Sequence, residues 1–383
     1  MRAAEASIAR DSLTTAVSLH EKAIAFRQAS DLRRAEPACR RAVALYGESE
    51  GRDHPDVANA LVELGQILEA RDRLIEARDC YARALAILTP APRKKGADPD
   101  LLRLYVRAQT LLAGAHRALG EYQRADVAYR RALAAARKFF GPRDPDVGGL
   151  LNNLGVLRKY QGRFDEAAGF YRQALAVIKR GDDPEATATL YHNLGGLEHS
   201  RGRFARGIPH ARRSVALREA MLGVDHPTVA ADVAALAALL DGDGALDEAA
   251  SLYQRALRIF RRKLGNKSGE VAINLSNLAA LRHGQKKTRE AEALYRQSLA
   301  LQEAIFGRRH PEVGMTLNNL AVLMREKGDG AAAAALYRRA VSIFEKVLGP
   351  RHPHTVTSRA NYEDLVPRRK QRRAAKAAAT NNR

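Results

Sequence analysis

Apolar and polar residues follow one another along this chain at the three- and four-residue steps of amphipathic helices. The stretch TLNNLAVL (residues 316–323) is typical, because Leu317, Leu320 and Leu323 fall on one helix face with polar residues beside them. Such steps place apolar side chains on one side of an α-helix. Similar stretches recur up to about residue 366, separated by short turns rich in Gly, Pro and Asp. The pattern predicts an all-α protein.

The helical pattern repeats with a period of about 42 residues. Tyr129 and Tyr171 are 42 residues apart, and so are successive members of the series Tyr253, Tyr295 and Tyr337. Glycines close successive units at the same interval, at Gly223, Gly265, Gly307 and Gly349. A fixed period of this length indicates one supersecondary unit stacked many times. We count about eight such units, the first of them degenerate.

Residues 310–349 show the parts of one unit. Pro311 suits the first turn of a helix, where its missing N–H costs nothing, and His310 before it lies at the helix boundary. The sequence KGDG then breaks the first helix. Ala333, Tyr337 and the following Ala340 form the packing face of a second helix. A large tyrosine among small neighbours allows two antiparallel helices to pack closely.

The order of a small residue in the first helix, then Ala, Tyr and Ala in the second, resembles tetratricopeptide repeats (TPR). The 42-residue period, the HP(D/E)V entry, the LNNL segment and the closing LG resemble kinesin light chains and their bacterial relatives. The resemblance implies a right-handed solenoid, an α-α superhelix, whose first helices line a concave groove. It concerns the repeat type only. The heptad segment by which the light chain binds the kinesin heavy chain has no counterpart here, so the protein is not expected to be a kinesin subunit.

The repeat pattern also predicts the organisation of the chain. Residues 1–12 form an N-terminal segment, and residues 13–366 form the solenoid, which ends in a capping helix near residues 354–366. Residues 89–100 (TPAPRKKGADPD) form an insertion loop rich in proline and basic residues. Residues 367–383 contain seven basic residues and no acidic one, and we expect a disordered tail there.

The fifth repeat departs from the pattern. It places Gly207, Ala211 and Ser214 where other repeats have Ala, Tyr and Ala. Without the large tyrosine, fewer atoms are available to fill the space between the two helices. We therefore expect looser packing in this repeat.

A second series of residues points to function. Aligned in the repeat, one asparagine recurs beside the packing stripe, and we call its members the rung asparagines: Asn153, Asn193, Asn277, Asn319 and Asn361. Each amide can donate and accept, as main-chain recognition of an extended peptide requires. The resemblance implies the same role. The alternative is structural, with each Asn bonding the neighbouring helix to hold the stacking register. Glu21, Glu63 and Leu111 replace Asn in the first three repeats, which confines the series to the C-terminal part.

In the repeat between Asn193 and Asn277, Ala235 occupies the position of the rung asparagine. Six residues after this alanine, and after each of the first four rung asparagines, lies a residue near the groove edge. These rim residues are Lys159, His199, Asp241, His283 and Arg325. Four of the five are basic or can become so. Beside the rung asparagines, Lys159 and Arg325 would favour an acidic peptide. The alternative is an ordinary solvated face of a basic protein.

The composition adds a strong positive charge. The 64 Lys and Arg exceed the 43 Asp and Glu by 21, which favours anionic partners without choosing among proteins, nucleic acid and charged membranes. An alternative function is therefore association with nucleic acid or an anionic surface through the basic tail, although no aromatic stacking platform accompanies it. Cys39 and Cys80 are too few for a disulfide framework, and we expect buried thiols. No signal peptide or membrane span is predicted, so we expect a cytoplasmic protein.

Catalytic and cofactor motifs are not found in the sequence. It contains no phosphate-binding glycine loop, nucleophile elbow or zinc-protease motif. The histidines His54, His226, His310 and His352 share one phase of the repeat, which fits helix entry better than metal coordination. We expect no enzyme activity, no cofactor and no metal. The sequence thus predicts an adaptor that binds an extended, acidic peptide, with oligomerisation through an end repeat as a further possibility.

Overall fold

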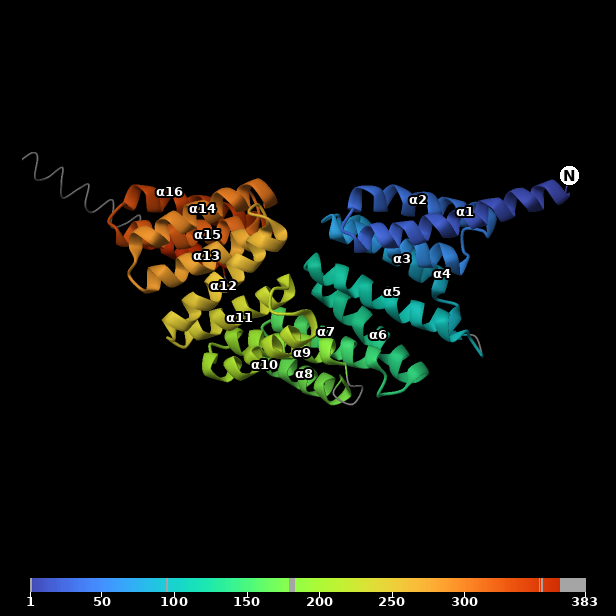
Figure 1. Ribbon diagram of the computed structural model, residues 1–383, viewed down its shortest axis with the longest axis horizontal. Helices are drawn as coiled ribbons and strands as arrows, with labels where there is room; N and C mark the ends of the chain where they lie inside the picture. Colours follow the sequence, from blue (N-terminus) through green and yellow to red (C-terminus); the bar gives the residue numbers. More distant parts are fainter. Residues whose placement is uncertain (1, 94–95, 179–182, 351, 353, 366–383) are drawn as a thin grey trace, which may run out of the picture. The chain divides into compact units, whose positions relative to one another are not determined.

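The computed structural model describes residues 2–93, 96–178, 183–350, 352 and 354–365, and these are helical throughout apart from the connecting turns. Figure 1 shows the helices in chain order. The first helices of the repeats are α1 (Arg2–Gln28), α3 (Pro55–Ala70), α5 (Pro99–Ala118), α7 (Pro145–Tyr160), α9 (Pro184–Ser200), α11 (Pro227–Gly242), α13 (Gly269–Gly284) and α15 (Pro311–Glu326). The second helices are α2 (Leu32–Ser49), α4 (Leu74–Leu88), α6 (Tyr122–Phe140), α8 (Phe164–Ile178), α10 (Phe204–Leu222), α12 (Leu246–Leu264), α14 (Thr288–Phe306) and α16 (Gly330–Val347). The prediction of an all-α repeat protein is confirmed.

The chain divides into two compact units, which we call unit 1 (Met1–Leu190) and unit 2 (Tyr191–Arg383). In unit 1, α1 packs on α2, α3 on α4, α5 on α6 and α7 on α8, and each second helix also contacts the next first helix as far as α7. In unit 2, the same alternation runs from α10 to α16. Each repeat therefore contacts its sequence neighbours, as expected of stacked helix pairs.

Three segments of the chain lie outside the regular repeats. Helix α1 begins at Arg2, so its backbone continues through residues 2–12. Between α4 and α5 the insertion contains one short 3-10 helix, η1 (Ala91–Arg93). A last helix covers residues 354–365, as predicted for the cap, and residues 366–383 lie outside the described part of the chain.

The repeated histidines start first helices. The Nδ1 atom of His54, His226 and His310 accepts a hydrogen bond from the backbone N–H two residues later, at 3.4, 3.2 and 3.2 Å. Asp98 and Asp144 accept the equivalent bond with a carboxylate oxygen, at 2.9 and 3.0 Å. These bonds satisfy a backbone donor that the helix itself leaves without a partner. The prediction that the histidines mark helix entry is confirmed.

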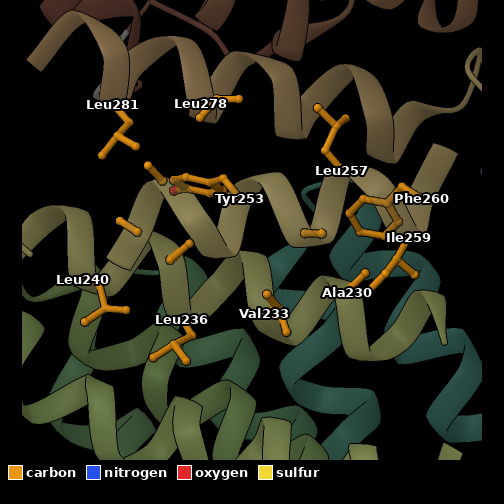
Figure 2. Packing of buried hydrophobic residues seen from close by; sticks show 14 of the residues in the cluster. Ala230, Val233, Leu236, Leu240, Tyr253, Leu257, Ile259, Phe260, Leu278 and Leu281 are labelled. Atoms are coloured by element: carbon orange, nitrogen blue, oxygen red, sulfur yellow. The ribbon is translucent and has the colours of Figure 1, made fainter. Parts of the chain in front are cut away.

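Tyrosines of the second helices fill the space left by small residues of the first helices. Tyr81, Tyr171, Tyr253, Tyr295 and Tyr337 are all fully buried. A Cβ atom added to Gly155 would lie 2.5 Å from Cε1 of Tyr171, so a larger residue there would displace the ring. Figure 2 shows Tyr253 lying between Leu281 on one side and Leu240 on the other, each from a neighbouring helix. Close interdigitation of tyrosine with small residues is therefore confirmed.

The prediction of looser packing in the fifth repeat is wrong. A Cβ atom on Gly207 would lie 2.5 Å from Cδ2 of Leu239, which reaches in from α11 and occupies the space. Ala211 is 3% exposed, and Ser214 is fully buried and donates a hydrogen bond to Asp232 at 2.6 Å. A leucine from the next repeat fills the space of the missing tyrosine. The sequence of the fifth repeat does not contain this leucine, so it could not predict the packing.

The helix at residues 354–365, the last that the structure describes, has a polar face. Its Thr355 and Ser358 are buried against the preceding repeat. However, Arg359 and Glu363 stand where α15 has the packing residues Leu317 and Ala321. Arg359 instead forms an ion pair with Glu345 of α16 at 2.6 Å. A face of this kind does not favour addition of a further helix, which makes the helix a cap.

The two cysteines differ in burial. Cys39 is buried, and burial raises the pKa of its thiol to about 12. Cys80 is half-buried, and burial raises the pKa of this thiol as well. Both thiols are free, and the prediction of buried cysteines is confirmed for Cys39 and holds in part for Cys80.

Candidate peptide-binding faces

The rung asparagines lie on first helices, at half-buried positions. Their places are Asn153 on α7, Asn193 on α9, Asn277 on α13, Asn319 on α15 and Asn361 on the helix at residues 354–365. In α15, buried Leu317, Leu320 and Leu323 supply the packing, and Asn319 lies beside them. Asn153 belongs to unit 1 and the other four to unit 2.

Three rung asparagines leave their amides open. Within the described residues, the side-chain amides of Asn153, Asn277 and Asn361 make no hydrogen bond. Asn319 accepts one long bond, at 3.4 Å, from the amide of Asn318. A half-buried amide without a protein partner is available to a ligand, because its two donors and its acceptor are unused.

The residue just before each of the first four rung asparagines is polar, and we call these residues the joint residues: Asn152, His192, Ser276 and Asn318. The Nδ1 atom of His192 lies 2.7 Å from Oδ1 of Asp232. The hydroxyl groups of Ser276 and Thr316 are 3.0 Å apart. Ser358 donates to Oδ1 of Asn318, also at 3.0 Å. In all three pairs the partner is 40 residues further along, on the next first helix.

Sequence reasoning missed these joints, because the joint residues differ in chemistry from repeat to repeat. What recurs is a polar partner at the same spacing, in the form of Asp232, Thr316 and Ser358. Pairing each polar joint residue with the residue 40 positions later would have found them. The inter-repeat bonding that the structural alternative assigned to the rung asparagines is thus carried out, in these three places, by their neighbours.

The joint at His192 is the most highly charged of the three. The Asp232 carboxylate, 3% exposed, accepts the Ser214 bond and forms an ion pair with Nε of Arg218 at 2.8 Å. Ser, His and Asp thus meet, but not in the order of a hydrolase triad, where histidine lies between the other two. Here the aspartate lies between them, and the serine hydroxyl is fully buried. The arrangement favours a structural role.

The rim residues are mostly engaged with other side chains. Arg325 forms an ion pair with Asp364 at 3.7 Å, and Nε2 of His283 lies 2.9 Å from Oε2 of Glu326. His199 contacts Phe204 edge-on. Asp241 is half-buried, and burial raises the pKa of its carboxyl group.

Lys159 differs from the other cations of the rim, because it has no acidic partner within the described residues. Its side chain is half-buried, and its ammonium lies 5.8 Å from the ring centroid of Tyr160. Burial, and secondarily the guanidinium of Arg117, lowers the pKa of Lys159.

Unit 1 contains a groove of about 830 Å³ on its first helices. Its floor includes Asn59 of α3, Arg107 and Thr110 of α5, and Gly149 and Asn153 of α7. Gly149 is exposed, and a Cβ atom there would meet nothing within 4 Å. Sequence reasoning had confined binding to the C-terminal part, because Asn is missing from the rung position of α3 and α5. Asn59 lies four residues before that position, one turn away, so the rung alignment overlooked it.

The groove carries charges of both signs. Asp56, Asp100, Asp146 and Asp183 line it at the starts of four successive first helices. Arg103 is held by Asp146 and Asp144, at 3.0 and 3.1 Å. Arg107 donates only to the side-chain oxygen of Gln66, at 2.7 Å, and keeps its charge unpaired within the described residues.

Two further expectations concern metal and membrane. Over the described residues, no group of three or more His, Cys, Asp or Glu side chains is placed to hold a metal ion. None of the described helices combines the length and the apolar character needed to cross a bilayer.

Comparison with known proteins agrees with the architecture. A family model described as tetratricopeptide repeat matches residues 8–89, 105–180, 186–262, 270–346 and 312–380, which is most of the chain. Among solved structures, the apo form of the quorum sensor NprR from B. thuringiensis superposes with a TM-score of 0.65, at 13% identity, over 86% of this chain and 87% of that one. At this identity the likeness shows the fold alone.

Curated relatives include two kinesin light chain-related proteins of Arabidopsis thaliana. Protein KINESIN LIGHT CHAIN-RELATED 2 is 24% identical over 209 residues, which are 54% of this chain and 30% of the relative. Protein KINESIN LIGHT CHAIN-RELATED 1 is 24% identical over 257 residues, 65% of this chain and 40% of the relative. The chain thus spans less than half the length of these relatives. It belongs to the tetratricopeptide repeat family, with repeats of the kinesin light chain-like type.

Proposed function

We propose that the protein is a non-enzymatic scaffold that holds an extended segment of a partner protein along its first helices. The family is one of protein-interaction repeats, which supports the general role. In the proposal, the rung asparagines of unit 2 hydrogen-bond the main chain of the segment. Main-chain groups recur along any extended peptide, so a series of amides can hold it with little regard to sequence.

One observation carries this proposal. Within the described residues, the side-chain amides of Asn277 and Asn361 make no hydrogen bond, while the side chains of the joint residues Ser276 and Asn318 bond the next repeat. A structural role would use the amides, because a half-buried polar group without a partner gives up stabilisation. Their open state favours a role in binding.

The segment is proposed to be acidic. Residues 191–367 contain 26 Lys and Arg against 18 Asp and Glu, so unit 2 is basic even without the tail. The ion pair of Arg325 with Asp364, at 3.7 Å, is partly exposed. Such pairs contribute only about 0–1 kcal/mol, so a carboxylate of the segment can replace Asp364 at little cost. Lys159, without an acidic partner among the described residues, belongs to unit 1 and is not part of the unit 2 site proposed here.

The chain offers a matched pair of variants for a test. Asn277→Ala with Asn319→Ala removes two rungs, and Ser276→Ala with Asn318→Ala removes two joint residues one position earlier. Peptides selected from a random display library on the wild type supply the ligands. We expect acidic residues to be enriched among them.

The rung variant should bind the selected peptides about tenfold or more weakly, because two hydrogen bonds are worth about 1–3 kcal/mol together. Its melting temperature should stay close to that of the wild type. The joint variant should show the reverse, with lowered melting temperature and retained affinity. Equal loss of affinity in both variants, or destabilisation by the rung variant, would assign the asparagines to stacking.

The alternative of nucleic-acid or anionic-surface association was based on the basic tail, residues 367–383, which lies outside the described residues. No geometry of the described residues favours it over peptide binding. Oligomerisation through an end repeat is likewise not favoured at the C-terminal end of unit 2, where Arg359 and Glu363 make the last helix polar.

A further inference from the structure

The groove of unit 1 is acidic along one side, although the chain as a whole is strongly basic. Asp56, Asp100, Asp146 and Asp183 each lie at the start of one first helix, from α3 to α9. Acidic side chains stabilise helix starts through the helix dipole, which explains their presence. That role leaves the outer carboxylate oxygens available to a ligand in the groove.

Three of the four carboxylates have no Lys or Arg partner within the described residues. Asp146 is the exception and is held by Arg103 at 3.0 Å. Over the same residues, Asp100 is exposed and forms no ion pair, and Asp56 meets only the half-exposed ring of His54, at 3.4 Å. Asp183 is exposed and accepts a backbone bond from Ala186 at 2.9 Å. Against these, the described lining residues offer one unpaired cation, Arg107. The free charge of the groove is therefore negative, and cations of a ligand would be attracted to its edge.

The spacing of the carboxylates indicates how far apart the cations of a ligand should be. The first helices α3 and α5 contact each other, and packed helices lie about 8–10 Å apart, so the starts of these two helices present carboxylates at about that interval. An extended chain in the polyproline II form advances about 9 Å in three residues and returns to the same face. A segment with a cation at every third residue can thus place one cation beside each helix start.

The chain contains a segment of that description. Residues 367–383 have seven basic residues and no acidic one, and Lys370, Arg373 and Lys376 follow one another at every third position. We propose that the groove of unit 1 binds this basic C-terminal segment, supplied by a second copy of the chain. The cations of the segment lie along the carboxylate edge, and Asn59 and Asn153 of the floor face its main chain.

This inference concerns a different face and an opposite charge from the proposed function. The partner segment of the proposed function is acidic and lies along the rungs of unit 2. The C-terminal segment is basic and lies in the groove of unit 1. If the rung variants bound acidic peptides as well as the wild type does, the proposed function would fail but this inference would stand. If the groove variant bound the basic peptide normally, this inference would fail but the proposed function would stand.

The test uses a fluorescent synthetic peptide of residues 367–383 and the full chain. In the full chain, Lys370, Arg373 and Lys376 are changed to Ala so that its own segment does not compete. Fluorescence anisotropy measures the affinity at low salt and at about 0.3 M salt, where exposed charges are strongly screened. The groove variant is Asp56→Asn with Asp100→Asn. Its control, Glu48→Gln with Asp79→Asn, removes the same charge from positions on α2 and α4 outside the groove.

A second comparison uses the peptide itself. Peptide A replaces Lys370, Arg373 and Lys376 with Ala, and peptide B replaces Arg368, Arg369 and Arg372. Both lose three charges, but only peptide A loses the cations at the proposed spacing. We expect peptide A to bind about fivefold or more weakly than peptide B, as about 1 kcal/mol of lost ion pairing would give.

The groove variant should weaken the unaltered peptide by a similar factor, and its control should change affinity less than about twofold. Added salt should weaken binding in every case. Circular dichroism melting of each variant shows whether the fold is kept. Equal losses from peptides A and B, equal losses from the groove variant and its control, or no binding of the unaltered peptide at low salt would each overturn the proposal.

Discussion

The groove of unit 1 and the rung face of unit 2 are built from the same helix pair, yet they present different chemistry. In unit 1 the starts of α3, α5 and α7 carry aspartates around a floor that contains Arg107. In unit 2 the faces of α13 and α15 carry amides, and the charge of the His192 joint is buried at Asp232. Buried tyrosines opposite small residues build most repeats of both units, and the fifth repeat is the exception described above. Packing positions define the repeat, while the positions beside them are free to vary and so to define a ligand.

The largest expected effect is a difference in stability between two variants, one that removes a buried charge of unit 2 and one that removes a surface charge of unit 1. Asp232→Ala removes the buried carboxylate that pairs with Arg218, and breaking such a pair costs about 3–5 kcal/mol. Asp56→Ala removes only a first-turn carboxylate, worth about 0.3–1 kcal/mol. Urea unfolding of both variants measures the two values. Similar losses of unfolding free energy in the two variants would show that Asp232 is not the main stabilising residue of its joint.

The next effect concerns the joints of unit 2. Ser276→Ala with Asn318→Ala removes two inter-repeat hydrogen bonds and should lower stability by about 1–3 kcal/mol in total. Compared with the wild type, this variant should exchange backbone hydrogens faster in α13 to α16, while α3 to α7 keep their wild-type rates. Hydrogen exchange read by mass spectrometry measures both regions. Uniform acceleration across both units would contradict a local joint.

A smaller effect, of opposite sign, is expected in the groove of unit 1. Gly149 lies inside α7, faces open space and has no positive φ angle. Gly149→Ala should therefore stabilise the protein by about 0.5–1 kcal/mol through helix propensity alone. Gly149→Gln should stabilise similarly while narrowing the groove and weakening any ligand bound there. Destabilisation by Gly149→Ala in thermal melts would mean that the position is packed.

The smallest expected effect is a pH dependence in unit 1. Burial lowers the pKa of His20, against the opposing charge of Glu63, and its ring lies edge-on to Tyr46. Because the folded-state pKa lies below the unfolded value, the unfolded chain takes up the proton first as the pH falls. Stability is thus full above about pH 6.5 and declines below it. His20→Leu should flatten this decline in melts taken on either side of that pH, and an unchanged slope would exclude His20 as its source.

Much of the fold could be predicted from the sequence because packing is periodic. Tyr171 and Gly155 recur in phase with their counterparts, so the helix pairs, the histidine entries and the cap near residue 354 followed from spacing alone. The fifth repeat did not follow, because Leu239, which fills the space beside Gly207, comes from the next repeat. Packing between repeats is set by side chains that a single repeat does not contain.

The candidate faces were predictable only in part. The rung asparagines are placed as the alignment expected, on first helices and beside the packing stripe. The joint residues were missed because His192, Ser276 and Asn318 share a partner spacing but no chemistry. The groove of unit 1 was missed because its residues, such as Asn59 and Arg107, come from a different turn of the first helix than the rungs. An alignment by one position cannot detect a surface built from several.

Rung amides are open and joint residues are occupied. The side-chain amide signals of selectively ¹⁵N-labelled asparagine report on the rungs, with Asn277, Asn319 and Asn274 assigned by single substitutions. Asn274 is the reference, because its buried amide donates to the backbone carbonyl oxygen of Tyr253 at 2.8 Å. When a selected acidic peptide is added, the signals of Asn277 and Asn319 should shift and exchange more slowly with solvent, while the signal of Asn274 stays in place. A shift of Asn274 with unmoved signals from Asn277 and Asn319 would contradict a role of the rungs in binding.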